Sequence, residues 1–315
     1  MDNDTSEFLL WEFSKNWELQ VMHIFLLLIL YSVTVTGNLF IIPAVVFDTH
    51  LHTPMYFFLM NLAMQDIGSV SVIVPKAVFN FLMNTRTISH FGCVAQVMLL
   101  FFFLSCDISL LTVMAYDRYV AICNPLQYEM IMNRKACIKM IGSIWTASFL
   151  NASLHTIFTF MTPFCSNNVN QFFCEVPYLL KLACSGLYVS EIVALIFSAT
   201  LVLCCLIFVL VTYMHVFCAV LRIPSVQGRK KAFTTCVPHL LVFSIFFFTG
   251  SLAYLKPISD SPSHFDFIIS IIYSIFPPMI NPFIYSLRNK DIKVALSRLF
   301  SVNTFTIKYF KSLLY

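Results

Sequence analysis

The sequence predicts an all-α membrane protein: seven transmembrane helices in one bundle, with a short amphipathic helix after the seventh span. Composition is the first reason. Hydrophobic residues make up 59% of the 315-residue chain and charged residues 11%, whereas soluble domains carry roughly 25% charged residues. The second reason is a series of apolar stretches, each long enough to cross about 30 Å of hydrocarbon. We expect helices at residues 21–46, 54–80, 92–120, 138–161, 190–220, 233–255 and 265–287.

The segment that precedes the first span, residues 1–20, is predicted to lie outside the membrane. Its start is acidic, with neither the basic residues nor the short apolar core of a cleavable signal peptide, so the first span acts as its own insertion signal. The sequon Asn3-Asp4-Thr5 predicts glycosylation at Asn3 on this outer side. We expect a multi-pass protein of the plasma membrane with an extracellular N-terminus.

The second span is the least regular, because Asp66 and Lys76 interrupt it. Lys76 lies near one end, where a lysine reaches the interface, but Asp66 is in mid-span. The distribution of basic residues supports keeping this helix. With the N-terminus outside, five of the 19 Lys and Arg residues fall in outer segments and 14 in inner segments, as the positive-inside rule requires.

The third span ends at Asp117-Arg118. A charged pair at the end of a hydrocarbon-length segment indicates a functional role, although a helix that stops at its first solvated charges would give the same pattern. A second acidic residue, Asp107, lies roughly 16 Å from the inner end by helix rise, and Asp66 of the second span lies roughly 18 Å from it. Asn38 and Asn281 fall near this layer.

Two buried carboxylates at one depth repel each other. They could share a proton or bind a sodium ion together with amide oxygens, and the alternative is that each carboxylate makes its own local hydrogen bond. Apart from this sodium alternative at Asp66 and Asp107, no metal and no other cofactor is predicted.

The last two spans contain several prolines, Pro238, Pro277, Pro278 and Pro282, which we expect to kink the helices. The segment 292–300 then places apolar residues at helical spacing among basic ones, which predicts an amphipathic helix on the inner membrane surface. The predicted organisation is therefore an outer segment 1–20, a bundle 21–287 and a cytoplasmic tail 288–315.

Of the 11 cysteines, four fall in predicted outer segments, the oxidising side on which disulfides persist. They are Cys93, Cys165, Cys174 and Cys184. Four cysteines allow three pairings.

Five motifs in order resemble those of an olfactory (odorant) receptor of the rhodopsin-like G-protein-coupled receptor class, along essentially the whole chain. They are Gly37-Asn38, Leu51–Tyr56, Met114–Tyr128, Lys231–Cys236 and Pro278–Asn289. The resemblance implies a receptor for odorants that activates a stimulatory heterotrimeric G protein and raises cyclic AMP.

Residue roles follow from the same resemblance. Asp117, Arg118 and Tyr119 would form the switch at the cytosolic end, where Asp117 holds Arg118 in the inactive state. Tyr213 and Tyr285 would support the active arrangement. The resemblance also implies the disulfides Cys93–Cys174 and Cys165–Cys184, and it places Asn38, Asp66, Asp107 and Asn281 in the family's polar layer.

Four positions depart from the family pattern. Pro238 replaces a usual serine, Thr212 replaces another, and Phe247-Phe248 replaces a tyrosine followed by a small residue. The change at Phe247 removes a hydroxyl group from the expected pocket floor.

The resemblance places the ligand pocket in the outer half of the bundle. Its expected lining is Val97, Leu100, Phe101, Leu104, Ser105, Phe197, Leu201, Phe247, Ser251, Tyr254, Ile271 and Ser274. These side chains are mostly apolar with a few hydroxyls, which is typical of a small-molecule cavity. No carboxylate lies on the outer half of the third span to anchor a cationic amine, so we expect a small, neutral, mostly apolar volatile.

Other classes of function are disfavoured. No reacting constellation of an enzyme is present, and no basic arm with interleaved aromatic residues indicates nucleic-acid binding. A transporter or channel would place Asp66 and Asp107 on a permeation path. A receptor for a peptide is disfavoured because the N-terminal segment is short and the outer loops lack a charged patch.

Overall fold

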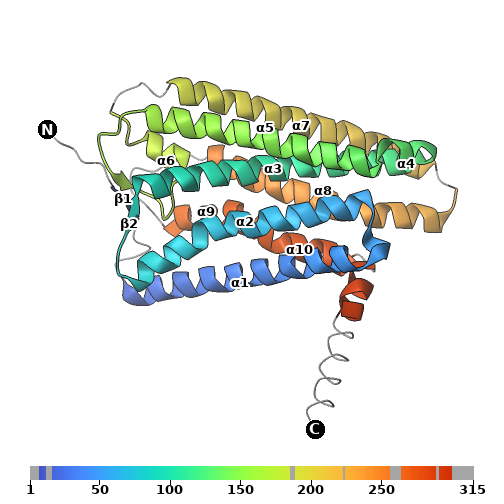
Figure 1. The fold of residues 1–315 in the computed structure, drawn as a ribbon, viewed down its shortest axis with the longest axis horizontal. Helices are drawn as coiled ribbons and strands as arrows, with labels where there is room; N and C mark the ends of the chain where they lie inside the picture. The colour runs from blue at the N-terminus through green and yellow to red at the C-terminus, as the bar shows by residue number, and fades with distance from the viewer. Residues whose placement is uncertain are drawn as a thin grey trace, which may run out of the picture.

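The computed structural model describes residues 7–11, 16–184, 189–222, 224–255, 264–288 and 291–299. Long, roughly aligned helices form one elongated bundle (Figure 1). The spans are α1 (Trp17–Phe47), α2 (Pro54–Leu82), α3 (His90–Cys123), α5 (Arg134–Met161), α7 (Val189–Leu221) and α8 (Val226–Leu255), followed by the pair α9 (His264–Ser274) and α10 (Phe276–Arg288). Short helices lie between them: η1 (Thr49–Leu51), η2 (Pro125–Gln127), α4 (Tyr128–Ile131) and α6 (Val176–Leu180).

Each of the first six predicted spans is a helix that covers the predicted range and extends beyond it at one end or both. Polar residues start three of them: the side chains of Asn16, Ser89 and Asn133 accept hydrogen bonds from backbone N–H groups in the first turn of α1, α3 and α5. The extension is largest in α8, which begins at Val226 rather than at residue 233. Apolar runs mark the part of a helix that crosses lipid, and α8 continues past it through charged residues.

Length and apolar composition alone qualify five helical segments among the described residues as membrane spans. They are α1, α2, α3, α7 and Phe267–Tyr285, which joins α9 to α10. The two predicted spans outside this set are α5 and α8. Helix α5 buries several polar side chains, including His155 and Thr159, and the apolar part of α8 among the described residues, Cys236–Leu252, is shorter than a span.

The seventh span is not the single helix predicted for 265–287. It is interrupted at Ile275, between α9 and α10. The physical reason is in the next residues, Pro277 and Pro278, because proline has no N–H group to donate to the carbonyls of Tyr273 and Ser274. The prediction of a proline-dependent irregularity in this span is thus confirmed, and that of an unbroken helix is wrong.

A small sheet that the sequence did not predict covers one end of the bundle. Strand β1 (Glu7–Leu10) pairs antiparallel with β2 (Thr87–Ser89) and parallel with β3 (Asn168–Val169), in the order β2-β1-β3. Phe8 and Leu10 of β1 are buried. The described part of the chain before the first span is therefore packed against the end of the bundle that carries β2 and β3.

Both predicted disulfides are present, Cys93–Cys174 and Cys165–Cys184. The first joins the start of α3 to the loop before α6, at the end of the bundle that carries β1 and β2 (Figure 1). Arg118 lies at the other end of α3, about 37 Å further along the helix axis. Arg118 and Cys174 thus lie at opposite ends of the bundle, as the predicted topology requires.

The helical segment 291–299 lies at the same end as α4 (Figure 1). Ile292 and Ala295 are buried and pack into the large inner cluster of apolar side chains. Arg298 makes an ion pair with Asp48, at the end of α1, at 3.1 Å. The predicted amphipathic helix therefore exists, and its apolar face packs against the bundle.

Candidate functional site

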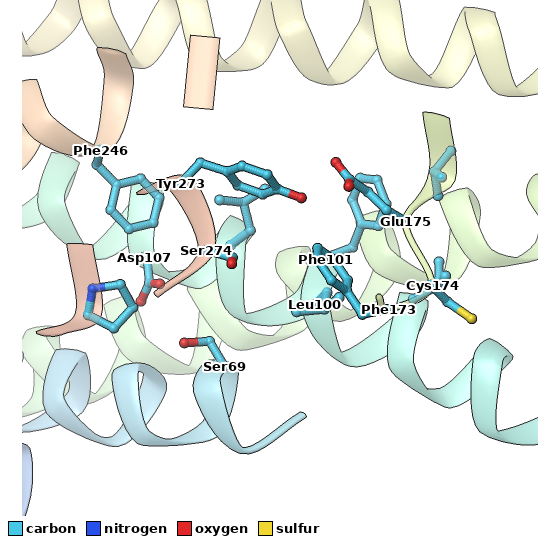
Figure 2. Close-up of a pocket in the computed structure, with 14 residues that line it drawn as sticks. Ser69, Leu100, Phe101, Asp107, Phe173, Cys174, Glu175, Phe246, Tyr273 and Ser274 are labelled. Atoms are coloured by element: carbon cyan, nitrogen blue, oxygen red, sulfur yellow. The ribbon is translucent and has the colours of Figure 1, made fainter. Parts of the chain in front are cut away.

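A pocket opens in the half of the bundle that carries the disulfides, the predicted outer half, between α3, the loop that carries Cys174, and the helices α8, α9 and α10. It encloses about 610 Å³ of space, including the part open to solvent. Figure 2 shows its side chains converging from these elements. The lining residues are Ser69, Val97, Leu100, Phe101, Leu104, Asp107, Phe173, Cys174, Glu175, Val176, Phe246, Tyr273, Ser274 and Pro278.

Five of the predicted lining residues are in this wall. Val97, Leu100, Phe101 and Leu104 line it from α3, and Ser274 from α9. The α3 residues recur at helical spacing, so they share one face of the helix. The four predicted α3 residues thus form the apolar side of this cavity, and their contact with a ligand stays a prediction.

The two predicted pocket residues of α7 lie elsewhere. Phe197 and Leu201 are 55% and 47% exposed and do not line the pocket. Most of α7 faces outward, so its large apolar side chains meet lipid. A uniformly apolar helix has no sequence periodicity that would separate its lipid face from its inner face.

Four other predicted pocket residues also lie away from this cavity. Ser105 lies at the contact with α5, where its hydroxyl accepts a hydrogen bond from Asn151 at 3.0 Å. Phe247 packs against the inner core cluster and its neighbour Phe246 lines the pocket instead. Ser251 and Ile271 lie outside the lining. The side chain of Tyr254, like Asn3, falls outside the described residues.

The loop between α5 and α7 contributes residues that sequence reasoning missed: Phe173, Glu175 and Val176. The predicted disulfide could have identified them, because residues next to Cys174 must lie beside α3. Gln96 strengthens this attachment, because its side-chain oxygen accepts a hydrogen bond from the Cys174 N–H at 2.7 Å, and its Nε2 donates to the Val72 carbonyl at 2.9 Å.

Glu175 gives the outer end of the pocket a polar group. The Nε2 of Gln171 donates to Glu175 Oε2 at 3.1 Å and to Ser270 Oγ at 2.7 Å. Burial raises the pKa of Glu175 to about 7, while hydrogen bonds from Tyr273 and Gln171 act in the opposite direction. Figure 2 shows the Tyr273 hydroxyl and the Glu175 carboxyl pointing toward each other.

The deep end of the pocket meets the predicted polar layer. Asp107 lines the pocket, and its Oδ1 is buried without a hydrogen-bond partner. Asp66 instead accepts two hydrogen bonds from Asn281 Nδ2, at 3.0 and 3.1 Å. Asn38 Nδ2 donates to the Pro278 carbonyl at 3.1 Å. Asp66, Asn38 and Asn281 therefore connect α1, α2 and α10, whereas Asp107 faces the cavity.

The predicted switch lies at the inner end of α3. Arg118 makes an ion pair with the fully buried Asp117, and its Nε donates to Asp117 Oδ2 at 2.9 Å. Asp117 Oδ1 accepts a further hydrogen bond from the Tyr128 hydroxyl at 2.7 Å. Burial is the main cause that raises the pKa of Tyr128, which keeps this hydroxyl protonated as the donor. The pair thus has the arrangement expected of an inactive state.

Three predicted tyrosines surround this pair. The Tyr213 hydroxyl is 2.8 Å from His239 Nδ1, and His239 Nε2 is 2.9 Å from the Leu111 carbonyl. Because a carbonyl can only accept, Nε2 carries the proton, and Tyr213 donates to Nδ1 of the neutral ring. Tyr119 packs edge-on against His215 of α7, and the hydroxyl of the buried Tyr285 has no hydrogen-bond partner.

Comparison with known proteins gives the family. The sequence profile described as "Olfactory receptor" matches residues 27–303. The chain belongs to the olfactory receptor family. Among curated human relatives, olfactory receptor 14A16 is 47% identical over 93% of this chain and 95% of its own length. Olfactory receptor 14I1 is 47% identical over 95% and 97%, and olfactory receptor 14L1 is 43% identical over 94% and 91%.

This membership places the seven helical spans in a multi-pass membrane protein and makes the chain a receptor rather than an enzyme. This olfactory receptor also contains a buried hydrogen-bond network that the sequence did not reveal. His155 of α5 lies 2.6 Å from Glu191 and 2.8 Å from Ser198 of α7, and His155 and Glu191 are fully buried. The His155 ring stacks on Phe101, with centroids 4.2 Å apart, so this network supports the pocket wall from behind.

Proposed function

We propose that this olfactory receptor binds small, mostly apolar volatile molecules in the outer pocket. Binding then activates a stimulatory heterotrimeric G protein that raises cyclic AMP. The observation that carries the proposal is the placement of two sites on one helix: the pocket wall Val97–Leu104 and the Asp117–Arg118 pair lie on the outer and inner parts of α3. Helix α3 thus connects the proposed ligand site with the end of the bundle that would face the G protein.

The proposed mechanism is a shift between two arrangements of the inner end. In the arrangement described here, Asp117 holds Arg118, and His239 of α8 holds Tyr213 of α7. A ligand that contacts α3, α8 and α9 favours activation only by binding the active arrangement more tightly. In that arrangement Arg118 leaves Asp117 and faces the G protein.

We place the receptor in the plasma membrane with its N-terminus outside. The disulfides support this orientation, because both lie at the end that carries β1, and disulfides persist on the oxidising side of a membrane. Arg118, Arg134 and Arg222 lie toward the opposite end, as the positive-inside rule requires of the cytoplasmic side.

A sodium ion near Asp66 and Asp107 remains part of the proposal. The described residues include no cluster of three or more His, Cys, Asp or Glu side chains that would hold a metal. However, the side-chain Oδ1 atoms of Asn38, Asp107 and Asn281 are buried without partners, and oxygen donors suit such a hard cation. Sodium bound here would neutralise part of the carboxylate charge in the polar layer.

The switch is tested by two substitutions in cells that carry a cyclic AMP reporter. Asp117→Asn removes the charge that holds Arg118 and is expected to raise basal cyclic AMP severalfold. Arg118→Ala removes the group that faces the G protein and is expected to abolish both basal and odorant-stimulated output.

Arg134→Ala is the matched control, because Arg134 is an exposed arginine at the same end of the bundle. Surface expression of each variant is measured in parallel. Unchanged cyclic AMP in both switch variants at normal expression would overturn the mechanism. Flux of an ion or solute through reconstituted receptor without any G protein would favour a channel or transporter.

A further inference from the structure

The pocket has a carboxyl group at each end and apolar side chains between them. Figure 2 shows Glu175 at one end and Asp107 at the other, beside Ser69 and Phe246. Both side chains are more than nine-tenths buried: Glu175 is 8% exposed and Asp107 is 1% exposed. Such groups are uncommon in a pocket that only has to hold an apolar molecule.

The ionisable groups of the lining are all of one type. Besides Asp107 and Glu175, the one ionisable side chain among the described lining residues is the phenol of Tyr273, and none of them is lysine, arginine or histidine. A ligand carboxylate would therefore enter with no cation to pair with and two carboxyl groups to repel it. The pocket chemistry disfavours acids as ligands.

Both carboxyl groups have acceptor capacity left for a ligand. A carboxylate offers about four acceptor positions, and Glu175 accepts hydrogen bonds from Gln171, at 3.1 Å to Oε2, and from Tyr273. Asp107 Oδ1 is buried and accepts no hydrogen bond. An unpaired buried carboxylate is costly, and a cation with several N–H donors is the partner that offsets that cost best.

The side chains around Glu175 suit a cation as well. Figure 2 places Phe101, Phe173 and Tyr273 near its carboxyl group. The faces of aromatic rings attract ammonium groups. Val97, Leu100 and Leu104 then provide an apolar wall for the rest of the molecule.

We propose that the pocket selects small amines, with Glu175 as the counter-ion of the protonated nitrogen and the α3 wall as the site of the apolar body. This inference rests on the proposed function, since it names the class of ligand for the same pocket. It also replaces the expectation of a neutral ligand. That expectation considered only α3 as the source of a carboxylate, whereas Glu175 enters from the outer loop.

The test uses purified full-length receptor in lipid nanodiscs and three ligands with the same ring: benzylamine, benzyl alcohol and benzoic acid. Binding is measured as ligand-induced thermal stabilisation over a concentration series, which needs no G protein. For the wild-type receptor at neutral pH, benzylamine is expected to bind about tenfold or more tightly than benzyl alcohol, and benzoic acid more weakly than both.

Glu175→Gln keeps the size and polarity of the side chain and removes its charge. It is expected to weaken benzylamine binding about tenfold and leave benzyl alcohol binding nearly unchanged. Glu129→Gln is the matched control, because Glu129 is exposed at the opposite end of the bundle, and it should change neither.

Equal binding of amine and alcohol by the wild-type receptor would overturn the proposal without any variant, so poor folding of Glu175→Gln cannot rescue it. Loss of amine and alcohol binding to the same extent in a folded Glu175→Gln receptor would also overturn it.

A mixed panel of neutral odorants is measured in the same assay. If neutral odorants stabilise the receptor and amines do not, the amine proposal fails while the receptor function stands; if no odorant of any class binds, the proposed function fails too.

Discussion

Glu175 combines the sequence position of a loop residue with the burial of a core residue. It directly follows Cys174, whose disulfide to Cys93 ties the loop to α3, so the carboxyl group is carried into the pocket wall. The result is an acidic group whose pKa burial raises to about 7 from an ordinary 4.5. This shift has a measurable consequence for stability.

Between pH 4.5 and 7, folded receptor binds the Glu175 proton more tightly than unfolded chain. Stability therefore falls as pH rises through this window, because the unfolded state ionises first. The loss attributable to Glu175 is at most about 3 kcal/mol. We expect the melting temperature of wild type, relative to Glu175→Gln, to decrease between pH 5 and pH 7.5 in nanodiscs. Parallel pH curves for the two proteins would contradict the assignment.

At the scale of elements, α1 and α10 come into close contact at Gly37. A Cβ atom on Gly37 would lie 2.9 Å from the Pro282 Cγ, so only glycine permits this contact. The neighbouring Asn38 bonds to the Pro278 carbonyl and fixes the same pair of helices. The two motifs that contain these residues lie far apart in the sequence and meet here.

Gly37→Ala is therefore expected to lower the melting temperature by several degrees, because α10 must shift away from α1. Gly142→Ala is the control in α5, where an added Cβ meets no atom within 4 Å. Since alanine favours a helix interior by about 1 kcal/mol over glycine, the control should be neutral or stabilising. Equal destabilisation by both substitutions would show that the contact with Pro282 does not matter.

The elements show which features of this receptor the sequence reveals. Hydrocarbon-length apolar runs and basic loops locate all seven spans, and the family motifs locate both disulfides, Asp117 and Arg118. Of the predicted pocket residues, only four on α3 and Ser274 on α9 line the cavity. The sequence does not reveal which face of α7 meets lipid, or how the loop after Cys165 folds back over α3. Both features depend on packing between distant segments, and such packing leaves no periodic pattern in the sequence. The buried pair His155–Glu191 escaped notice for the same reason.

At the scale of the whole molecule, the outer end is an assembly of distant segments. The strand Glu7–Leu10 lies between residues near α2 and residues of the loop after α5, and two disulfides fasten that loop. The Cys93–Cys174 bridge spans 81 residues and the Cys165–Cys184 bridge spans 19. Because the entropy of an open chain grows with loop length, the first should stabilise the fold by about 1 kcal/mol more.

We expect the double substitution Cys93→Ser and Cys174→Ser to abolish ligand-induced stabilisation, since Phe173, Glu175 and Val176 flank Cys174 in the pocket wall. Cys165→Ser with Cys184→Ser should lower the melting temperature less and retain ligand binding. Both pairs are compared in the nanodisc assay. Retained binding after loss of the first bridge would show that the loop holds its place without it.

The interruption at Ile275 divides the seventh span into two working parts. Tyr273 and Ser274, before it, contact the pocket, while Asn281 and Tyr285, after it, belong to the inner half of the bundle. The two backbone hydrogen bonds to the Tyr273 and Ser274 carbonyls cannot form at this junction. A bound odorant could therefore rotate the outer part relative to the inner part without breaking the hydrogen bonds of a continuous helix.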